Sequence, residues 1–119
     1  MEALEVAKEM QIKINTIKKM RGELSNRAST KSYAVANYEK NIALTIAKLR
    51  NGIEIDFEGQ KIKDPPVTIM EKLVRGICWK EKLDMEDAEN MYRSLIVNIG
   101  CVESELNALQ SINRYLDKI

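Results

Sequence analysis

Residues of the types that usually carry chemistry are few in this chain. It contains no histidine, so the side chain that most often acts as a general base near neutral pH is absent. It has two cysteines, Cys78 and Cys101, without the second cysteine or histidine pair that a zinc finger needs. Two cysteines at this spacing do not indicate a disulfide framework either. On one helix they would be about 34 Å apart, too far for a disulfide. We therefore predict two reduced thiols in a cytoplasmic protein.

Acidic residues gather at two places, and neither matches a metal-binding pattern. A run within residues 81–89 lacks the Glu-x-x-His pairs of carboxylate metal helices. The second group lies on one face of a predicted strand, because its members are spaced by two: Glu54, Asp56 and Glu58. This group lacks the EF-hand pattern of a calcium site. Glycine patterns for phosphates or dinucleotides and a nucleophile elbow are missing as well. The sequence thus predicts that the protein is not an enzyme and uses no metal or other cofactor.

Basic residues form a cluster that could contact phosphates. The net charge is only +1, but residues 1–50 carry +5 and residues 51–119 carry −4. Five cations fall in the first part of the chain: Lys13, Lys18, Lys19, Arg21 and Arg27. In the register given below, only Glu103 and Glu105 are placed to neutralise them, so part of the cluster could bind nucleic acid. No aromatic residues are interleaved with it, so stacking on single strands is not supported.

The element that positions these cations is a long helix, predicted over residues 2–50. Alternating steps of four and three from Ala3 to Leu49 meet an apolar or aromatic residue at eleven of fourteen positions, which is the 3.5-residue period of a coiled coil. A one-sided helix of this length, about 70 Å, needs a partner over its apolar stripe. Weak helix formers gather between Arg21 and Thr30. We favour a continuous helix, and two helices with a break at residues 26–31 are the alternative.

A connector over residues 51–66 follows. Asn51-Gly52 is a typical helix end, and alternation from Ile53 to Phe57 with a turn at Glu58-Gly59 predicts a β-hairpin at 53–62. Asp64-Pro65-Pro66 blocks helix continuation. A short helix is predicted at 67–75, with Ile69, Met70, Leu73 and Val74 on its buried side and Gly76 as a corner.

The partner of the first helix is a second long helix, predicted over residues 77–117. It repeats the four-three pattern, which places Met91, Leu95, Asn98, Val102, Glu105, Leu109 and Ile112 on its inner stripe. The connector makes the pair antiparallel. With Arg50 opposite Ile77, Ile17 faces Gln110 and its neighbours, and Gly100 lies about opposite Arg27 and Ala28. The predicted fold is therefore all-α: a long antiparallel, coiled-coil-like helical hairpin with a short connector of β-hairpin and helix.

Apolar residues outside the two stripes predict a further protein contact. Two helices alone would leave them exposed, so we expect a helical bundle completed by oligomerisation, as a homodimer or a higher homo-oligomer. The candidate contact residues are Leu44, Ile46, Tyr92, Ile96, Ile99 and Leu106. The first residues of the chain lack the pattern of a signal peptide, and no apolar stretch approaches membrane-spanning length. We therefore expect a cytoplasmic protein with a protein partner and no membrane contact.

The part of the chain from about residue 45 to residue 116 resembles small, mostly uncharacterised helical-hairpin proteins of phages and prophages that are encoded in early regions. The matching segments are Lys48-Leu49-Arg50, Leu73-Val74-Arg75-Gly76, Ala88 with Tyr92, and the stretch from Leu106 to Tyr115. The segment 53–62 departs from the shorter connector of that group. The resemblance implies a host-cell cytoplasmic protein that acts by binding, for example as an inhibitor or modulator of a host or phage protein such as a defence nuclease. An accessory nucleic-acid-binding role in phage recombination or replication is the alternative.

Overall fold

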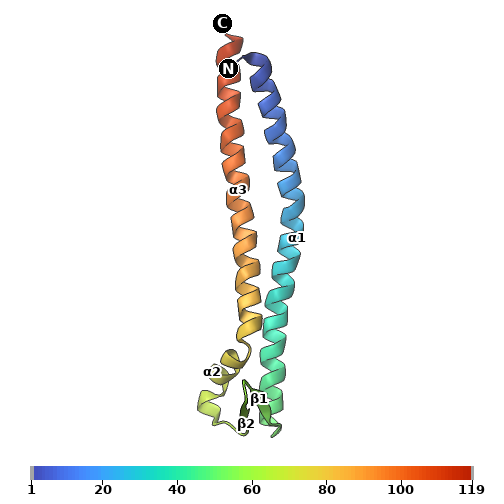
Figure 1. Cartoon of the computed structure of the whole chain (residues 1–119), viewed down its shortest axis with the longest axis vertical. Coiled ribbons are helices and arrows are strands. Elements are labelled where there is room, and N and C mark those ends of the chain that lie inside the picture. Colours follow the sequence, from blue (N-terminus) through green and yellow to red (C-terminus); the bar gives the residue numbers. More distant parts are fainter. Residues whose placement is uncertain (1, 119) are drawn as a thin grey trace. The chain divides into compact units, whose positions relative to one another are not determined.

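The computed structural model describes residues 2–118, and this part of the chain contains two long helices, a short helix and one β-hairpin (Figure 1). The predicted fold class is confirmed, because two long helices are joined by a small two-stranded hairpin and a short helix. The elements are α1 (Ala3–Arg50), β1 (Ile55–Phe57), β2 (Gln60–Ile62), α2 (Val67–Ile77) and α3 (Trp79–Asp117).

Helix α1 is continuous, so the alternative with a break at residues 26–31 is wrong. Its weak helix formers each cost less than about 1 kcal/mol, which is not enough to open a helix that is held along one face. The helix ends as predicted at Gly52, whose φ is +74°. The Gly52 amide donates to the Leu49 carbonyl at 3.2 Å, and the Ile53 amide donates to the Lys48 carbonyl at 3.0 Å. These two bonds form a Schellman motif, which favours glycine at its left-handed position.

The predicted hairpin is present, but it is shorter than residues 53–62. Its pairs are Ile55 with Ile62, Asp56 with Lys61, and Phe57 with Gln60. The turn residues Glu58 and Gly59 have φ values of 50° and 82°, so both adopt the left-handed region that a type I′ turn requires. Ile53 cannot join the first strand because its amide is already bonded at the end of α1.

The corner between the last two helices lies at Cys78, which corrects the prediction of Gly76. Gly76 is inside α2, which extends to Ile77, and α3 begins at Trp79 instead of residue 77. The Cys78 amide donates to the Val74 carbonyl at 3.0 Å, and its carbonyl accepts from the Lys82 amide at 3.1 Å. The chain therefore turns at one residue without losing these hydrogen bonds. The φ of Cys78 is −89°, so glycine is not needed there.

The chain divides into two compact units. The described part of unit 1 is residues 2–29 with 90–118, and unit 2 is residues 30–89. The core of unit 2 joins the second part of α1 to α2 and the corner, through Tyr38, Leu49, Met70, Val74 and Cys78. Ile55 and Ile62 of the hairpin pack against this core. The hairpin is thus stabilised by the helices, as a two-stranded sheet of this size requires.

Position Tyr38 offers a test of this core. Only 8% of the residue is exposed, and its buried hydroxyl has no hydrogen-bond partner within residues 2–118. An unsatisfied buried hydroxyl costs free energy, so we expect Tyr38→Phe to leave the free energy of unfolding unchanged or to raise it by about 1 kcal/mol. Urea unfolding followed by circular dichroism measures this change. Tyr33→Phe is the control because Tyr33 is 74% exposed and should show no effect. A clear loss of stability in Tyr38→Phe alone would contradict the prediction.

In unit 1, the beginning of α1 and the end of α3 lie side by side and run antiparallel. Lys13 pairs with Glu105, and Arg21, which comes later in α1, pairs with Glu103, which comes earlier in α3. The predicted orientation is therefore confirmed for this unit. The predicted register is wrong by about one helical turn, because Ile17 lies beside Leu106 instead of Gln110. The Arg27 side chain reaches the Met91 carbonyl, so it does not face Gly100.

The apolar stripes follow the predicted period but differ in detail. On α1, Val6 is fully buried while Ala3 and Ala7 are exposed, and the predicted positions from Met10 onward are correct except for exposed Arg21. On α3, Ile99 and Leu106 face inward, where the predicted stripe had Asn98 and Glu105. Met91 and Ile112 of the predicted stripe are also exposed, at 55% and 41%. At Val6, Ile99 and Leu106 the inner residue is the one with the larger apolar side chain of the two neighbours. This choice follows from the greater free energy gained by burying it.

Candidate functional site

The structure separates the five candidate cations into three groups. Two of them form ion pairs: Lys13 Nζ lies 2.6 Å from Glu105, and Arg21 lies 2.8 Å from Glu103. Arg27 donates to the backbone carbonyl of Met91 at 3.0 Å. Within residues 2–118, Lys18 and Lys19 form no ion pair and no side-chain hydrogen bond. The structure therefore does not bring the five together as one unpaired patch.

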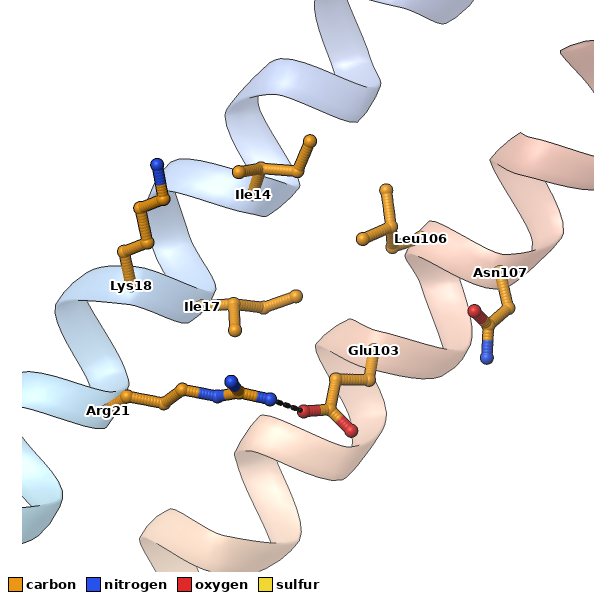
Figure 2. A pocket seen from close by; sticks show the side chains of 7 residues that line it. All are labelled: Ile14, Ile17, Lys18, Arg21, Glu103, Leu106 and Asn107. Atoms are coloured by element: carbon orange, nitrogen blue, oxygen red, sulfur yellow. Dashed lines mark hydrogen bonds and ion pairs between the residues drawn. The ribbon is translucent and has the colours of Figure 1, made fainter.

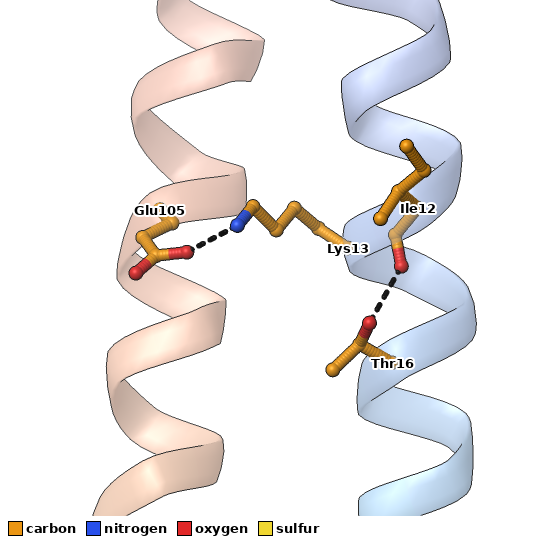
Figure 3. Close-up of polar contacts among 4 residues, drawn as sticks. All are labelled: Ile12, Lys13, Thr16 and Glu105. Carbon is orange, nitrogen blue, oxygen red and sulfur yellow. Dashed lines mark hydrogen bonds and ion pairs between the residues drawn. The ribbon is translucent and has the colours of Figure 1, made fainter.

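The two glutamates named from the sequence are the ones that pair with the cluster. Figure 3 shows Lys13 reaching across to Glu105, while the nearby Thr16 hydroxyl donates to the Ile12 carbonyl within α1. The hydrogen bond to Glu105 raises the pKa of Lys13, despite an opposing effect of burial. Lys13 is therefore held in its charged form while its charge is neutralised locally. It is not available to phosphates in the way that the sequence alone suggested.

The six candidate contact residues do not lie on one exposed surface. Ile99 is only 8% exposed, so it was wrongly assigned to an outer face. Ile46 is half-buried and packs against the core of unit 2. Tyr92 and Leu106 are half-buried. Leu44 and Ile96 are exposed as expected, at 48% and 45%.

Members of the two candidate sets meet in a groove of unit 1, which we call the α1–α3 groove. It has a volume of about 390 Å³ and is lined by Ile14, Ile17, Lys18, Arg21, Glu103, Leu106 and Asn107. In Figure 2, Ile14 and Ile17 of α1 point toward Leu106 of α3, and the Arg21–Glu103 pair crosses the groove at one end. The groove therefore combines an apolar floor with a charged rim.

The rim carries more positive than negative charge. Among the described residues that line the groove, Glu103 is the only carboxylate, and Arg21 and Lys18 are the cations. The Arg21 and Glu103 side chains are 65% and 42% exposed, so their pairing is a surface ion pair that contributes little to stability. A guanidinium has five N–H donors, and Glu103 occupies one of those of Arg21. Cationic donors thus remain beside the apolar floor.

A second hollow, on unit 2, was not foreseen from the sequence. It has a volume of about 310 Å³ and is lined by Phe57, Ile69, Lys72, Leu73 and Gly76. Ile69 was assigned to the buried side of the short helix, yet it is 50% exposed. The spacing of apolar residues in so short a helix was compatible with four inward-facing positions. In the structure, only Met70 and Val74 of α2 are buried.

The two cysteines occupy different environments, and both are free thiols. Cys78 is 3% exposed, and its Sγ lies 3.8 Å from the Thr45 hydroxyl. Burial raises the pKa of the Cys78 thiol, and the Thr45 contact only partly opposes this effect. Cys101 is exposed on α3. Because the thiolate is the reactive form, Cys78 is disfavoured as a nucleophile by both its access and its ionisation.

This contrast predicts selective labelling. In the folded protein at pH 8, we expect a maleimide to modify Cys101 at about the rate of a free thiol and Cys78 at least about a hundredfold more slowly. Mass spectrometry after timed quenching measures both rates. In the variant Cys101→Ser, rapid labelling should disappear, and it should return on addition of urea. Rapid labelling of Cys78 without denaturant would show that unit 2 opens readily.

Two general properties of the described residues bear on function. None of the helices has a stretch that is both long and apolar enough to cross a membrane. Within residues 2–118, no three cysteine or acidic side chains gather closely enough to hold a metal ion. No protein-family model matches the chain, and comparisons with curated proteins and with solved structures gave no match.

Proposed function

We propose that the protein is a non-catalytic helical interaction module that binds another protein and associates with copies of itself. The observation that carries this proposal is the balance of its apolar side chains. Among the described residues, fourteen large hydrophobic side chains are exposed, whereas ten hydrophobic residues are buried. Single exposed apolar residues are ordinary, but a long helix pair that leaves this many large apolar side chains exposed offers surface that a partner protein or a further copy of the chain would cover.

The exposed set includes residue types that dominate protein interfaces. Trp79 is 42% exposed, and Tyr33 and Tyr115 are 74% and 67% exposed. Tryptophan and tyrosine are enriched among the residues that contribute most to binding. They occur in both units, so the proposal includes a partner protein as well as a homodimer or higher homo-oligomer.

The resemblance to helical-hairpin proteins of phages and prophages extends this proposal. It supports a role in the host-cell cytoplasm as an inhibitor or modulator of a host or phage protein, such as a defence nuclease. This extension rests on the likeness of residues 45–116 alone, and no chemistry of the described residues adds to it.

Accessory binding of nucleic acid is the second candidate function. It is favoured by Lys18 and Lys19, which are adjacent, exposed and without ion pairs in the described part of the chain. Two phosphate contacts would give only a shallow salt dependence, with a slope of about −1.4 on single strands. We rank this function second because the other three cations of the cluster already have partners: two form ion pairs with glutamates, and one donates a hydrogen bond to a backbone carbonyl.

Affinity capture from a lysate of the encoding organism, combined with light scattering, tests the proposed module. The bait is the full chain, beside one variant with Val67→Ser, Ile69→Ser and Trp79→Ser and one with Val97→Ser and Tyr115→Ser. We expect a protein to be captured by the wild type and lost with at least one variant, because these exposed apolar side chains would form the contact. Lys40→Ser with Lys48→Ser is the control, since both lysines are exposed and form no ion pair within residues 2–118. Capture that no apolar variant reduces, or a strict monomer with nothing captured, would contradict the module.

A further inference from the structure

We propose that the α1–α3 groove of unit 1 binds an acidic segment of the partner protein that inserts one apolar side chain between the two helices. This proposal deepens the interaction module and rests on it. It names the chemistry of the partner: a large aliphatic or aromatic residue flanked by aspartate or glutamate. The supporting features are the floor of the groove, the charges on its rim and the volume that it encloses.

The floor is suited to an apolar anchor. Ile17 is 8% exposed, and Ile14 and Leu106 are half-buried, so these three side chains form a continuous apolar base. They lie on both helices and point toward one another (Figure 2). The volume of about 390 Å³ is within the range of ordinary ligand pockets and can hold one large side chain. Burial in such a pocket is typical of the anchor residues of protein interfaces.

The rim selects the sign of charge on the incoming segment. Lys18 lines the groove without an ion pair in the described residues, and Lys19 is the next residue along α1. Arg21 keeps donors that Glu103 does not use. Carboxylates beside the anchor could therefore pair with Lys18 and Arg21 without removing the Arg21–Glu103 bond. A basic segment would meet two cations and gain only Glu103, which Arg21 already neutralises.

The same features favour a protein segment over nucleic acid. Phosphates would use the cations but would leave the apolar floor without a partner. None of the described residues that line the groove is aromatic, so bases would have no ring on which to stack. An acidic peptide with an apolar anchor satisfies the floor and the rim together.

Selection from a displayed library of random twelve-residue peptides tests this inference with the full-length protein as bait. We expect the enriched peptides to combine a Leu, Ile, Met, Phe or Trp with at least two acidic residues. The Lys18→Glu, Lys19→Glu double variant should lose this enrichment. Lys8→Glu with Lys40→Glu, which reverses two exposed α1 lysines outside the groove, should keep it.

Fluorescence anisotropy with the most enriched peptide then gives affinities. For the Lys18→Glu, Lys19→Glu variant we expect Kd to rise about tenfold or more, as for paired charges at an interface. Leu106→Ala should raise Kd several-fold, whereas Leu4→Ala at a 67% exposed site should leave it within about twofold. Circular dichroism confirms folding of Leu106→Ala. The two lysine substitutions are at exposed sites, so their result does not depend on a core change.

Each other outcome would overturn the inference. These outcomes are absence of enrichment, enriched peptides without acidic residues, and binding that the Lys18 and Lys19 substitutions do not weaken. Tighter binding of a 20-nucleotide single strand than of the best peptide, lost in the same variant, would assign the site to nucleic acid. Failure of the module itself gives a different pattern, in which nothing is captured from the lysate or no apolar variant reduces the capture. A lysate partner that depends on the apolar variants but not on Lys18 and Lys19 preserves the module and removes the groove.

Discussion

Replacing Leu49 with alanine is expected to lower the free energy of unfolding by about 3 kcal/mol. Leu49 is 1% exposed and packs with Met70, Val74 and Cys78 in the core of unit 2. Alanine would remove buried methyl groups and leave a cavity between α1 and α2, because the surrounding helices can close it only in part. Urea unfolding followed by circular dichroism measures the loss.

The matched control is Leu44→Ala, five residues earlier on the same helix. Leu44 is 48% exposed, so we expect its replacement to change stability by no more than about 0.5 kcal/mol. The two variants have the same chemical change and differ in burial. Equal effects would mean that the core does not lie where α2 meets α1. A loss of partner capture in Leu44→Ala alone would place this residue in an interface.

Replacing Ser29 with proline is expected to cost about 3 kcal/mol or more. Position 29 lies in the part of α1 that is rich in weak helix formers, and the structure places it inside one uninterrupted helix. Proline there removes a backbone hydrogen bond, and its ring clashes with the carbonyl of Ser25. Helix content from circular dichroism and the free energy of unfolding should both fall.

The control for the proline variant is Ser29→Ala. Ser29 is exposed, and alanine is the better helix former, so its stability should be unchanged or higher by a few tenths of a kcal/mol. If residues 26–31 formed a loop instead, the proline would be tolerated and would cost less than about 1 kcal/mol. A small effect of Ser29→Pro would therefore restore the alternative of two shorter helices.

The fold was predictable because its signals are local. The 3.5-residue period from Met10 to Leu49, the Gly52 end and the Glu58-Gly59 turn each depend on residues that are close in sequence. The predicted stripe was wrong where either of two neighbouring residues could have faced inward, as at Asn98 and Ile99, of which Ile99 is buried. The corner was also misplaced, because glycine signals a turn only where the backbone needs a positive φ, and Cys78 turns with a negative one.

The site was predictable only as two separate lists. Lys18 and Arg21 were chosen for their charge, and Leu106 for an apolar surplus on the other helix. No pattern of neighbouring residues in the sequence indicates that these side chains meet, because their proximity depends on the register of α1 against α3. A shift of one helical turn changes which side chains meet, and surface ion pairs are too weak to identify the register from the sequence.

The sequence by itself determined that the chain forms two long helices with a short connector, and that residues with ordinary catalytic chemistry are few. These properties follow from residue type and spacing along one helix at a time. Only the tertiary structure decided that Lys13 and Arg21 are paired, that Ile99 is buried, and that the α1–α3 groove combines Leu106 with cationic side chains. Such features depend on which turns of two distant segments lie side by side, and packing free energy summed over the whole contact selects that arrangement.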